Sequence, residues 1–420
     1  MHDFEYKGKE LFCEDVAVKD IAAQVGTPFY LYSRKTIVEH YQKLARAFKS
    51  VKPLICFSMK ANSNLAVLKA LVKEGAGLDI VSGGELFRAL KVGTDPKKIV
   101  YAGVGKSRKE ITDAIRTGIL LFNVESTGEL VALNEIAGKL KKKVNVSLRV
   151  NPDVEASTHS YITTGKKESK FGIELDTAEA VFLDKARYSN IDLCGIHVHI
   201  GSQITVGDPF VKAFRKVLIF IANLEKHGAR IKFLNLGGGL GIIYSDEKPQ
   251  TADEFAHRIL PLLASRKLQV IFEPGRFIVG NAGIFVSRVI YSKKTQTKNF
   301  VVVDGAMNDL IRPSLYGAHH EVLAVSKSEN FKRIKADLVG PVCETGDFLA
   351  RDRDMPDFQT GELVALMSAG AYGFTMSSNY NSRPRVPEVM VALAQFEIVR
   401  RRETFSDLIR GERVPAFLKK

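Results

Sequence analysis

A series of short apolar runs that alternate with helical patterns is the feature that most constrains this fold. Buried strands of a parallel sheet read as continuous apolar runs. Eight such runs are present: LICFSM (54–59), LDIVS (78–82), KIVYAG (98–103), LLFNVES (120–126), VNVSLRVN (144–151), LCGIHVHIG (193–201), IKFLNLGGG (231–239) and LQVIFEPG (268–275). Helical stretches lie between several of them: 65–75, 84–93, 128–140 and 211–228. Alternation of strands and helices predicts an α/β fold with a parallel sheet. Eight strands favour a closed (β/α)8 barrel, and an open doubly wound sheet is the alternative.

The pattern changes after about residue 283. The runs IFVSRVIYS, NFVVVDG, ELVALMSAG and EVMVALAQFEIVRRR are typical of β-strands, and no regular helices separate them. Two further strand-like pieces, FEYKGKELF and PFYLYS, occur in the first 33 residues. The sequence therefore predicts two domains: a barrel over residues 31–282, and a β-rich sandwich or barrel formed by residues 1–30 together with 283–420.

Composition excludes several classes of protein. The chain has 420 residues, of which 45% are hydrophobic and 26% charged, as in globular proteins. It has no run of about 18 apolar residues, so we expect no membrane span. Its start, MHDFEYKGKELFCED, lacks the apolar core of a secretory signal. The four cysteines form no CxxC pair, which argues against a disulfide framework or a zinc site and favours the cytoplasm.

The net charge of +14 is spread along the chain, with modest clusters at 141–143 and 400–402. A solvated surface explains this distribution, and we expect no nucleic-acid partner. Binding of nucleic acid remains the alternative that composition alone would allow. A site for anionic ligands is also compatible with the charge, although total charge cannot identify one.

Unusual residues follow the predicted strands at their C-terminal ends, where barrels of this kind carry their function. Lys60 ends the first apolar run, although an ammonium is rarely buried unless it is paired or neutralised. It is either a surface lysine or an amine kept neutral for covalent chemistry. The other strand ends contribute Asp79 and Ser82 (second), His197, His199, Gly201 and Ser202 (sixth), Gly237, Gly238, Gly239 and Gly241 (seventh), and Glu273, Gly275 and Arg276 (eighth).

Each of these motifs has more than one interpretation. The run GGGLG (237–241) could form a turn or let backbone N–H groups approach a phosphate, and it lacks the GxGxxG spacing of dinucleotide sites. The HVH pattern could be a core pair or a metal pair, but no third and fourth ligand are evident. In EPGR (273–276), the two charges could form a local salt bridge. Alternatively, the carboxylate could bind a protonated ring nitrogen and the guanidinium a carboxylate or phosphate.

The combination of a lysine, a histidine, glycines and an acid at these strand ends resembles the fold-type III pyridoxal-phosphate enzymes, the group of alanine racemases and basic amino acid decarboxylases. Within that group, the chain resembles the diaminopimelate decarboxylases. The segments that carry the resemblance are FSMKAN, DIVSGGEL, RVNPDVEASTHSYITTGKKESKFGI, HVHIGSQ, LNLGGGLG, EPGR, RPSLYGAHH, GPVCETGD and AGAYGFTMSSNYNSRPRVPEV. Two departures are small: Phe57-Ser58 stands where Tyr-Ala is more usual, and Thr345 where Ser is.

The resemblance implies a role for each matching residue toward pyridoxal 5'-phosphate (PLP). Lys60 would form the Schiff base and His199 would stack on the ring. Glu273 would pair with the pyridine nitrogen and keep the ring a strong electron sink for the carbanion left by CO2. The phosphate would be held by Ser202, Gly238 and the backbone of Gly275 and Arg276, with Tyr372 nearby, while Asp79 would support the cofactor's surroundings.

The resemblance also implies a site shared between two subunits. Cys343 would protonate the carbanion in the partner's site, although without the resemblance it reads as an ordinary buried thiol. Glu344 would bind the distal ammonium of the substrate. Its distal carboxylate would be bound by Arg276, Arg312 and Tyr316, with Tyr372 also at the substrate. A homodimer is therefore expected, with no metal.

The expected reaction is PLP-dependent decarboxylation of meso-2,6-diaminopimelate to L-lysine and CO2, the last step of lysine biosynthesis. Arg312 favours this substrate because it would repel the purely cationic distal end of ornithine or lysine. A decarboxylase of carboxynorspermidine is the nearest alternative. A racemase would be expected to have an arginine in place of Glu273. A small PLP-binding protein would lack the β-rich domain that carries Cys343 and Tyr372.

Overall fold

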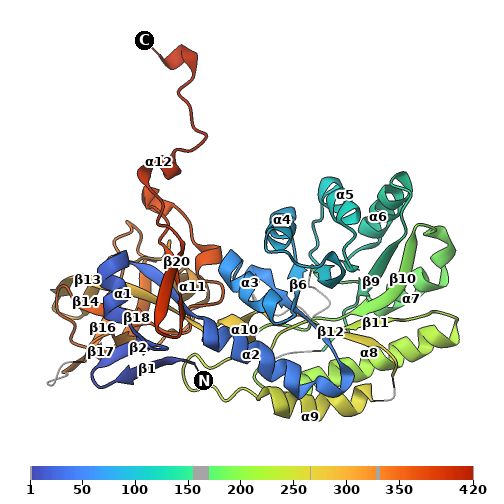
Figure 1. Cartoon of the computed structure of the whole chain (residues 1–420), viewed down its shortest axis with the longest axis horizontal. Helices are drawn as coiled ribbons and strands as arrows, with labels where there is room; N and C mark the ends of the chain where they lie inside the picture. The colour runs from blue at the N-terminus through green and yellow to red at the C-terminus, as the bar shows by residue number, and fades with distance from the viewer. Residues whose placement is uncertain (1, 155–169, 265, 328–331, 420) are drawn as a thin grey trace. The chain divides into compact units, whose positions relative to one another are not determined.

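The computed structural model describes residues 2–154, 170–264, 266–327 and 332–419. The chain divides into two compact units. One unit is Thr36–Gly280, and the other combines Met1–Lys35 with Asn281–Lys420. Figure 1 shows the strands and helices along the chain.

The unit Thr36–Gly280 is built around a closed barrel of eight parallel strands. The neighbours around the barrel are β10-β11-β12-β5-β6-β7-β8-β9, so that β12 pairs with β5 and closes it. This confirms the predicted (β/α)8 barrel and excludes the open sheet. The strands are β5 Leu54–Ser58, β6 Gly77–Ile80, β7 Ile99–Tyr101, β8 Leu121–Val124, β9 Val144–Arg149, β10 Ile191–His197, β11 Phe233–Asn235 and β12 Gln269–Phe272.

Helices connect the strands and lie around the outside of the barrel, as Figure 1 shows for α4, α5 and α6 and for α2, α8 and α9. The bounds are α2 Arg34–Ala47, α3 Leu65–Lys73, α4 Gly83–Lys91, α5 Arg108–Thr117, α6 Thr127–Lys139, α7 Leu175–Leu183, α8 Asp208–Lys226 and α9 Ala252–Leu263. The four predicted helices correspond to α3, α4, α6 and α8. Both α5 and α9 begin with a capping box, in which a Ser or Thr and the third helical residue satisfy each other's backbone N–H groups.

Apolar side chains fill the inside of the barrel. Cys56, Val100, Leu121 and Ile271 form a fully buried cluster from β5, β7, β8 and β12. Outside the strands, the ring of Phe48, the residue that follows α2, lies with its centroid 4.6 Å from that of Phe272 in β12. A barrel packed in this way has no open channel, so reactive groups gather at the strand ends.

The second unit is β-rich, as the sequence predicts. Its largest sheet has the order β17-β16-β14-β13-β4-β19-β20, and β18 pairs with β13 and β15. The N-terminal β4 lies inside this sheet, antiparallel to β13 and parallel to β19. The strands are β1 Phe4–Lys7, β2 Glu10–Cys13, β3 Val16–Ala17, β4 Phe29–Ser33, β13 Gly283–Lys294, β14 Asn299–Val303, β15 Val322–Ala324, β16 Arg333–Val339, β17 Phe348–Pro356, β18 Leu363–Leu366, β19 Glu388–Ala392 and β20 Gln395–Arg400.

Short helices complete the second unit: α1 Val18–Val25, α11 Arg312–Tyr316 and α12 Phe405–Leu408. The run EVMVALAQFEIVRRR folds as a hairpin of β19 and β20, and it turns at Leu393, where φ is +56°. Strands β15, β16 and β17 have no counterpart among the predicted strands. Among the described helices of both units, none combines the length and the apolar character that crossing a membrane requires.

The barrel core predicts a position-dependent cost of truncation. Leu121→Ala should lower the free energy of unfolding by about 2–5 kcal/mol, because a buried leucine leaves a cavity when it is shortened. Leu183→Ala is the control, since that side chain is 58% exposed at the end of α7 and its loss should change stability by less than about 0.5 kcal/mol. Urea unfolding followed by circular dichroism measures both, and equal effects would contradict the assignment of Leu121 to the core.

Candidate active site

Lys60 lies just beyond β5, in the short helical turn η2 Met59–Ala61. Its Nζ is 3.1 Å from Oδ2 of Asp79, and its side chain is 42% exposed while that of Asp79 is fully buried. The pairing follows from the sheet, because Ser58 lies beside Asp79 in the register of β5 and β6. The lysine that ends the first apolar run is therefore a paired amine at the strand end.

Asp79 is the buried partner of this amine. Its Oδ2 also accepts a hydrogen bond of 2.5 Å from the Ser58 hydroxyl, and within the described residues its Oδ1 has no hydrogen-bond partner. Burial and then the charge of Glu273 raise the pKa of Asp79, while Lys60 and Ser58 oppose this rise. The balance makes Asp79 a carboxyl that can share a proton with the neighbouring amine.

Glu273 follows β12 and is a buried carboxylate with three neighbours from other strands. Its Oε1 accepts hydrogen bonds from the Asn123 amide at 3.0 Å and the Asn235 amide at 2.6 Å. Its Oε2 lies 3.2 Å from Nε2 of His197. Burial alone would raise the pKa of Glu273, but His197, Lys60 and the Asn235 amide together hold it below the usual range. The carboxylate therefore stays ionised.

The two histidines of the HVH pattern have different surroundings. His197 ends β10 and faces Glu273, whereas the Nδ1 atom of His199 accepts a hydrogen bond of 3.1 Å from the backbone N–H of Gly238. Burial, followed by the charges of Arg149 and Lys60, lowers the pKa of His199 well below its usual value. His199 is therefore a neutral imidazole whose Nδ1 is an acceptor.

Glycines after β11 allow a close backbone crossing. A Cβ at Gly238 would lie 2.2 Å from the carbonyl oxygen of Glu273, so no other residue fits there without movement. Gly237 and Gly239 have φ values of +65° and +108°, which side chains disfavour. The Gly238 N–H is directed to His199. The glycine loop therefore allows the close backbone crossing and also positions the His199 imidazole.

Arg276 ties three loops together at the same end of the barrel. It follows Gly275, which precedes the short helix α10 Arg276–Val279. Its guanidinium donates to the Tyr244 hydroxyl at 2.5 Å and to the Ser202 hydroxyl at 3.2 Å. The loops after β10, β11 and β12 thus meet at one buried cation.

Sequence reasoning missed several groups at this site. Asn123 and Asn235 each stand inside an apolar strand, and a polar residue near such a strand's C-terminal end is the signal that could have revealed them. Glu85, within the segment DIVSGGEL, accepts a hydrogen bond of 2.7 Å from the Val81 N–H. Burial, with help from the charge of Asp79, raises the pKa of Glu85 to about 7. Ser82 has a local role, because its hydroxyl caps α4.

Buried charges also join the ends of β7, β8 and β9. Arg149 donates to Glu125 at 2.9 Å, and Lys106 lies 2.7 Å from Glu129. The Glu129 carboxylate accepts the backbone N–H of Glu125 and so links the two ion pairs. All four side chains are less than a tenth exposed, so the pairs are strongly constrained. Residues 155–169, in the motif that starts at Arg149, lie outside the described residues.

The remaining predicted residues belong to the β-rich unit. Arg312 starts α11, is buried and lies 2.9 Å from the His320 ring, and Tyr316 ends the same helix. Cys343 is exposed, in contrast to Cys13, Cys56 and Cys194, which are buried. Tyr372 is half-buried with φ of +56°.

Cys343 and its neighbour Glu344 contact a single segment of the chain. The backbone N–H of Cys343 donates to Oδ1 of Asn381 at 2.9 Å, and the Tyr380 hydroxyl donates to the Glu344 carboxylate at 3.4 Å. The structure thus brings these two predicted residues together with Tyr380 and Asn381, which sequence reasoning did not single out. Both lie in the segment 369–389, whose match to the family was the available signal.

Comparisons with known proteins identify the family of this chain. The family model for the pyridoxal binding domain of pyridoxal-dependent decarboxylases matches residues 34–280. The diaminopimelate decarboxylase of Pseudomonas aeruginosa is 50% identical over 98% of this chain and 99% of its own length. That of Aquifex aeolicus is 48% identical over 96% of each chain.

Solved structures extend the similarity to the whole fold. A diaminopimelate decarboxylase from M. jannaschii in complex with L-lysine is 35% identical, with a TM-score of 0.94 over 100% of both chains. That from Helicobacter pylori with L-lysine is 40% identical, with a TM-score of 0.90 over 93% of this chain and 98% of that chain. With a family match across the barrel and relatives that span both units, this chain belongs to the pyridoxal-dependent decarboxylase family.

Proposed function

We propose that this protein decarboxylates meso-2,6-diaminopimelate to L-lysine and CO2 with PLP as cofactor, as the last step of lysine biosynthesis. The observation that carries the proposal is the ionised, buried Glu273 at the same barrel end as the paired amine of Lys60. The near full-length similarity to diaminopimelate decarboxylases supports the choice of substrate. The L-lysine in two of the similar structures is the product that the proposed reaction would release.

The residues of the barrel end fit PLP. Glu273 is a buried anion of the kind that a protonated ring nitrogen requires, and His199 is a neutral ring suited to stacking on a planar cofactor. Two buried oxygens, Oδ1 of Asp79 and Oδ1 of Asn123, have no hydrogen-bond partner among the described residues. Both could accept a hydrogen bond from a bound ligand. Ser202, Gly238 and the backbone of Gly275 and Arg276 would hold the phosphate, with Tyr372 nearby.

The protein's own groups would then act on protons and charge. Lys60 would carry the cofactor through its amine, which must first lose a proton, and Asp79 is within reach to accept it. Glu273 would keep the ring nitrogen protonated because its own pKa is lowered. When bound, PLP supplies an electron-withdrawing ring that accepts the electron pair left as the bond to the carboxylate breaks.

Most of the proposed recognition groups and the proposed proton donor belong to the β-rich unit. The distal end of meso-diaminopimelate carries both a carboxylate and an ammonium, so the protein must offer both a cation and an anion there. We assign the binding of the distal carboxylate to Arg276, Arg312 and Tyr316, with Tyr372 also at the substrate. The distal ammonium is assigned to Glu344. Cys343 Sγ would donate a proton to the carbon that lost CO2. We propose that Cys343 and Glu344 act in the site of a second copy, so that the enzyme is a homodimer.

Other functions fit the site less well. A racemase on this fold would be expected to place an arginine rather than Glu273 at the ring nitrogen, which would weaken the electron sink. A carboxynorspermidine decarboxylase would share much of this site. The two activities are distinguished by which of the two substrates the enzyme prefers. We propose a cytoplasmic location, since the described cysteines are all free thiols.

Removal of the proposed cofactor lysine gives the most direct test. Lys60→Ala should abolish CO2 release from meso-diaminopimelate and also the cofactor's visible absorbance band, because the covalent link to PLP is lost. Lys109→Ala removes an 85% exposed lysine and should leave both unchanged. Normal turnover by the Lys60 variant would refute its role.

The substrate assignment rests on Arg312. Arg312→Ala should weaken binding of meso-diaminopimelate by about 10- to 150-fold, the equivalent of the roughly 1.5–3 kcal/mol of a charge-assisted contact. The measurement is KM and kcat, with Arg333→Ala as the control because that arginine is half-exposed on β16. Unchanged KM and kcat in the Arg312 variant would remove this residue from the site.

The acid Glu85 near Lys60 predicts a pH dependence of stability. Its pKa is raised to about 7 in the folded state, so between about pH 4.5 and 7 the folded protein binds more protons than the unfolded chain. This group's contribution to stability is therefore lost as pH rises through that window. Glu85→Gln should gain stability relative to the native protein, on the order of 1–3 kcal/mol by pH 7, with little difference at pH 4.5. A gap that does not vary with pH in urea unfolding would contradict the raised pKa.

A further inference from the structure

We infer that Asn381 is a positioning residue that fixes the main chain of Cys343, and that the turn which carries it sets the thiol and the Glu344 carboxylate together. The inference rests on the roles proposed above for Cys343 and Glu344. Two consecutive residues of one segment contact two consecutive residues of the other: Asn381 meets Cys343 at 2.9 Å and Tyr380 meets Glu344 at 3.4 Å.

The loop that carries the thiol is pinned on both sides of Cys343. The buried Asp347 carboxylate accepts the N–H groups of Val342 and Met307, both at 2.7 Å. The backbone of Glu344 closes the loop through its N–H to Val342 and its carbonyl to the N–H of Asp347. The N–H of Cys343 is directed out of the loop to the side chain of Asn381. The orientation of the peptide that precedes the thiol is thus set from another segment.

Asn381 makes this contact from a costly backbone conformation. Its φ is +55°, and the next residue, Ser382, has φ of +53°. Asparagine tolerates the left-handed region better than most residues, but such conformations are unfavourable and persist only where their surroundings enforce them. Two in succession indicate that the turn is held by contacts outside itself.

Those contacts come from a polar network that brackets the turn. The Asn379 amide donates to the carbonyl oxygen of Arg383 at 3.0 Å, which spans the turn, and to Glu403 at 2.7 Å. Glu403 also accepts the backbone N–H and the Nε–H of Arg385. Hydrogen bonds from these groups, together with the charge of Arg385, outweigh partial burial and lower the pKa of Glu403. It therefore holds the turn as an anion.

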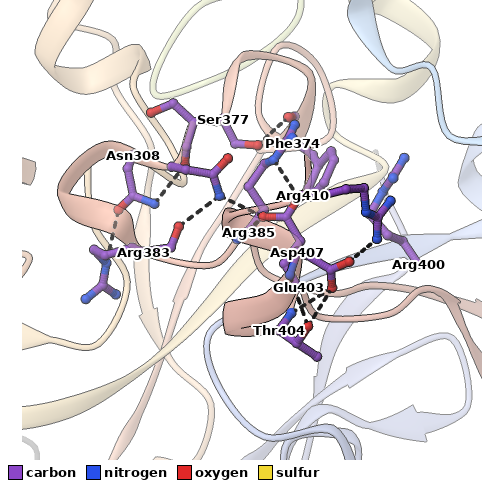
Figure 2. Close-up of polar contacts among 12 residues, drawn as sticks. Asn308, Phe374, Ser377, Arg383, Arg385, Arg400, Glu403, Thr404, Asp407 and Arg410 are labelled. Atoms are coloured by element: carbon purple, nitrogen blue, oxygen red, sulfur yellow. Dashed lines mark hydrogen bonds and ion pairs between the residues drawn. The ribbon is translucent and has the colours of Figure 1, made fainter. Parts of the chain in front are cut away.

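The opposite side of the turn is anchored in the same way. Arg383 donates from Nε to Oδ1 of Asn308 at 3.2 Å, and the Asn308 amide donates to the carbonyl oxygen of Ser378. Figure 2 shows Asn308 with Arg383 on one side of this network and Arg385 with Glu403 on the other. The turn that presents Tyr380 and Asn381 is consequently rigid on both flanks. Tyr380 and Asn381 are adjacent in this turn, and they contact the adjacent residues Glu344 and Cys343. A displacement of the turn would therefore move the Cys343 thiol and the Glu344 carboxylate together.

The test compares Asn381→Gly with Asn381→Asp. Glycine accepts the positive φ but removes the acceptor, whereas aspartate keeps an acceptor oxygen. Ser382→Gly is the matched control, because it relieves the same backbone strain at the next residue. Steady-state kinetics with meso-diaminopimelate give kcat and KM. Iodoacetamide labelling of the folded holoenzyme reports Cys343 selectively, since Cys13, Cys56 and Cys194 are buried.

The expected result is a loss in Asn381→Gly of about 3- to 10-fold in kcat, within the range for one hydrogen bond, with a several-fold change in the rate of Cys343 labelling. Asn381→Asp should recover most of both, and Ser382→Gly should match the native protein. Tyr380→Phe should raise KM more than it lowers kcat. It removes the hydrogen bond to Glu344, the proposed substrate-binding group, and leaves the contact of Asn381 with Cys343 in place.

Two outcomes separate this inference from the proposed function. If Cys343→Ala keeps the native kcat, the proposed proton donor is wrong. If Cys343→Ala is slow but Asn381→Gly keeps both native kinetics and native labelling, the positioning role is wrong while the function stands. Thermal unfolding of each variant checks that the fold is intact, and a loss in Asn381→Gly that aspartate does not restore would also overturn the inference.

Discussion

The buried carboxylate of Glu273 is the interaction on which the site depends. An ionised group inside a protein costs several kcal/mol unless other groups satisfy it. Here the amides of Asn123 and Asn235 and the ring of His197 do so, and they come from β8, β11 and β10. These residues are distant in sequence, so the anion can be stabilised only when the barrel is closed. Folding and the assembly of the site are therefore one event.

That anion also sets the behaviour of the groups around it. Burial and then the charge of Glu273 raise the pKa of Asp79, whereas the pKa of Glu273 itself is lowered, so two carboxyl groups in one site are shifted in opposite directions. A pair of acids whose environments separate their pKa values is a common basis for divided roles in catalysis. Here it would place a permanent anion at the ring nitrogen and a proton acceptor beside Lys60.

In the β-rich unit, too, neighbouring side chains position the proposed functional groups, but the contacts are weaker and lie at the surface. Cys343 and Glu344 are exposed, and their loop is held by the buried Asp347 carboxylate and by side chains of a neighbouring turn. The position of this turn depends on Glu403, near the C-terminal end of the chain, because its carboxylate accepts a hydrogen bond from the Asn379 amide. Residues without a proposed chemical role would thus set where the proposed proton donor and the proposed recognition carboxylate lie.

The sequence by itself determined the alternation of strands and helices, because burial of a parallel sheet leaves continuous apolar runs, and it determined which residues stand at the strand ends. Lys60, His199 and Glu273 could be found in that way. Their partners could not: Asn123 contacts Glu273 across 150 residues, and Asn381 contacts Cys343 across 38. Only the tertiary structure decided these pairs, since they depend on barrel closure and on a turn of polar residues that carries no periodic signal.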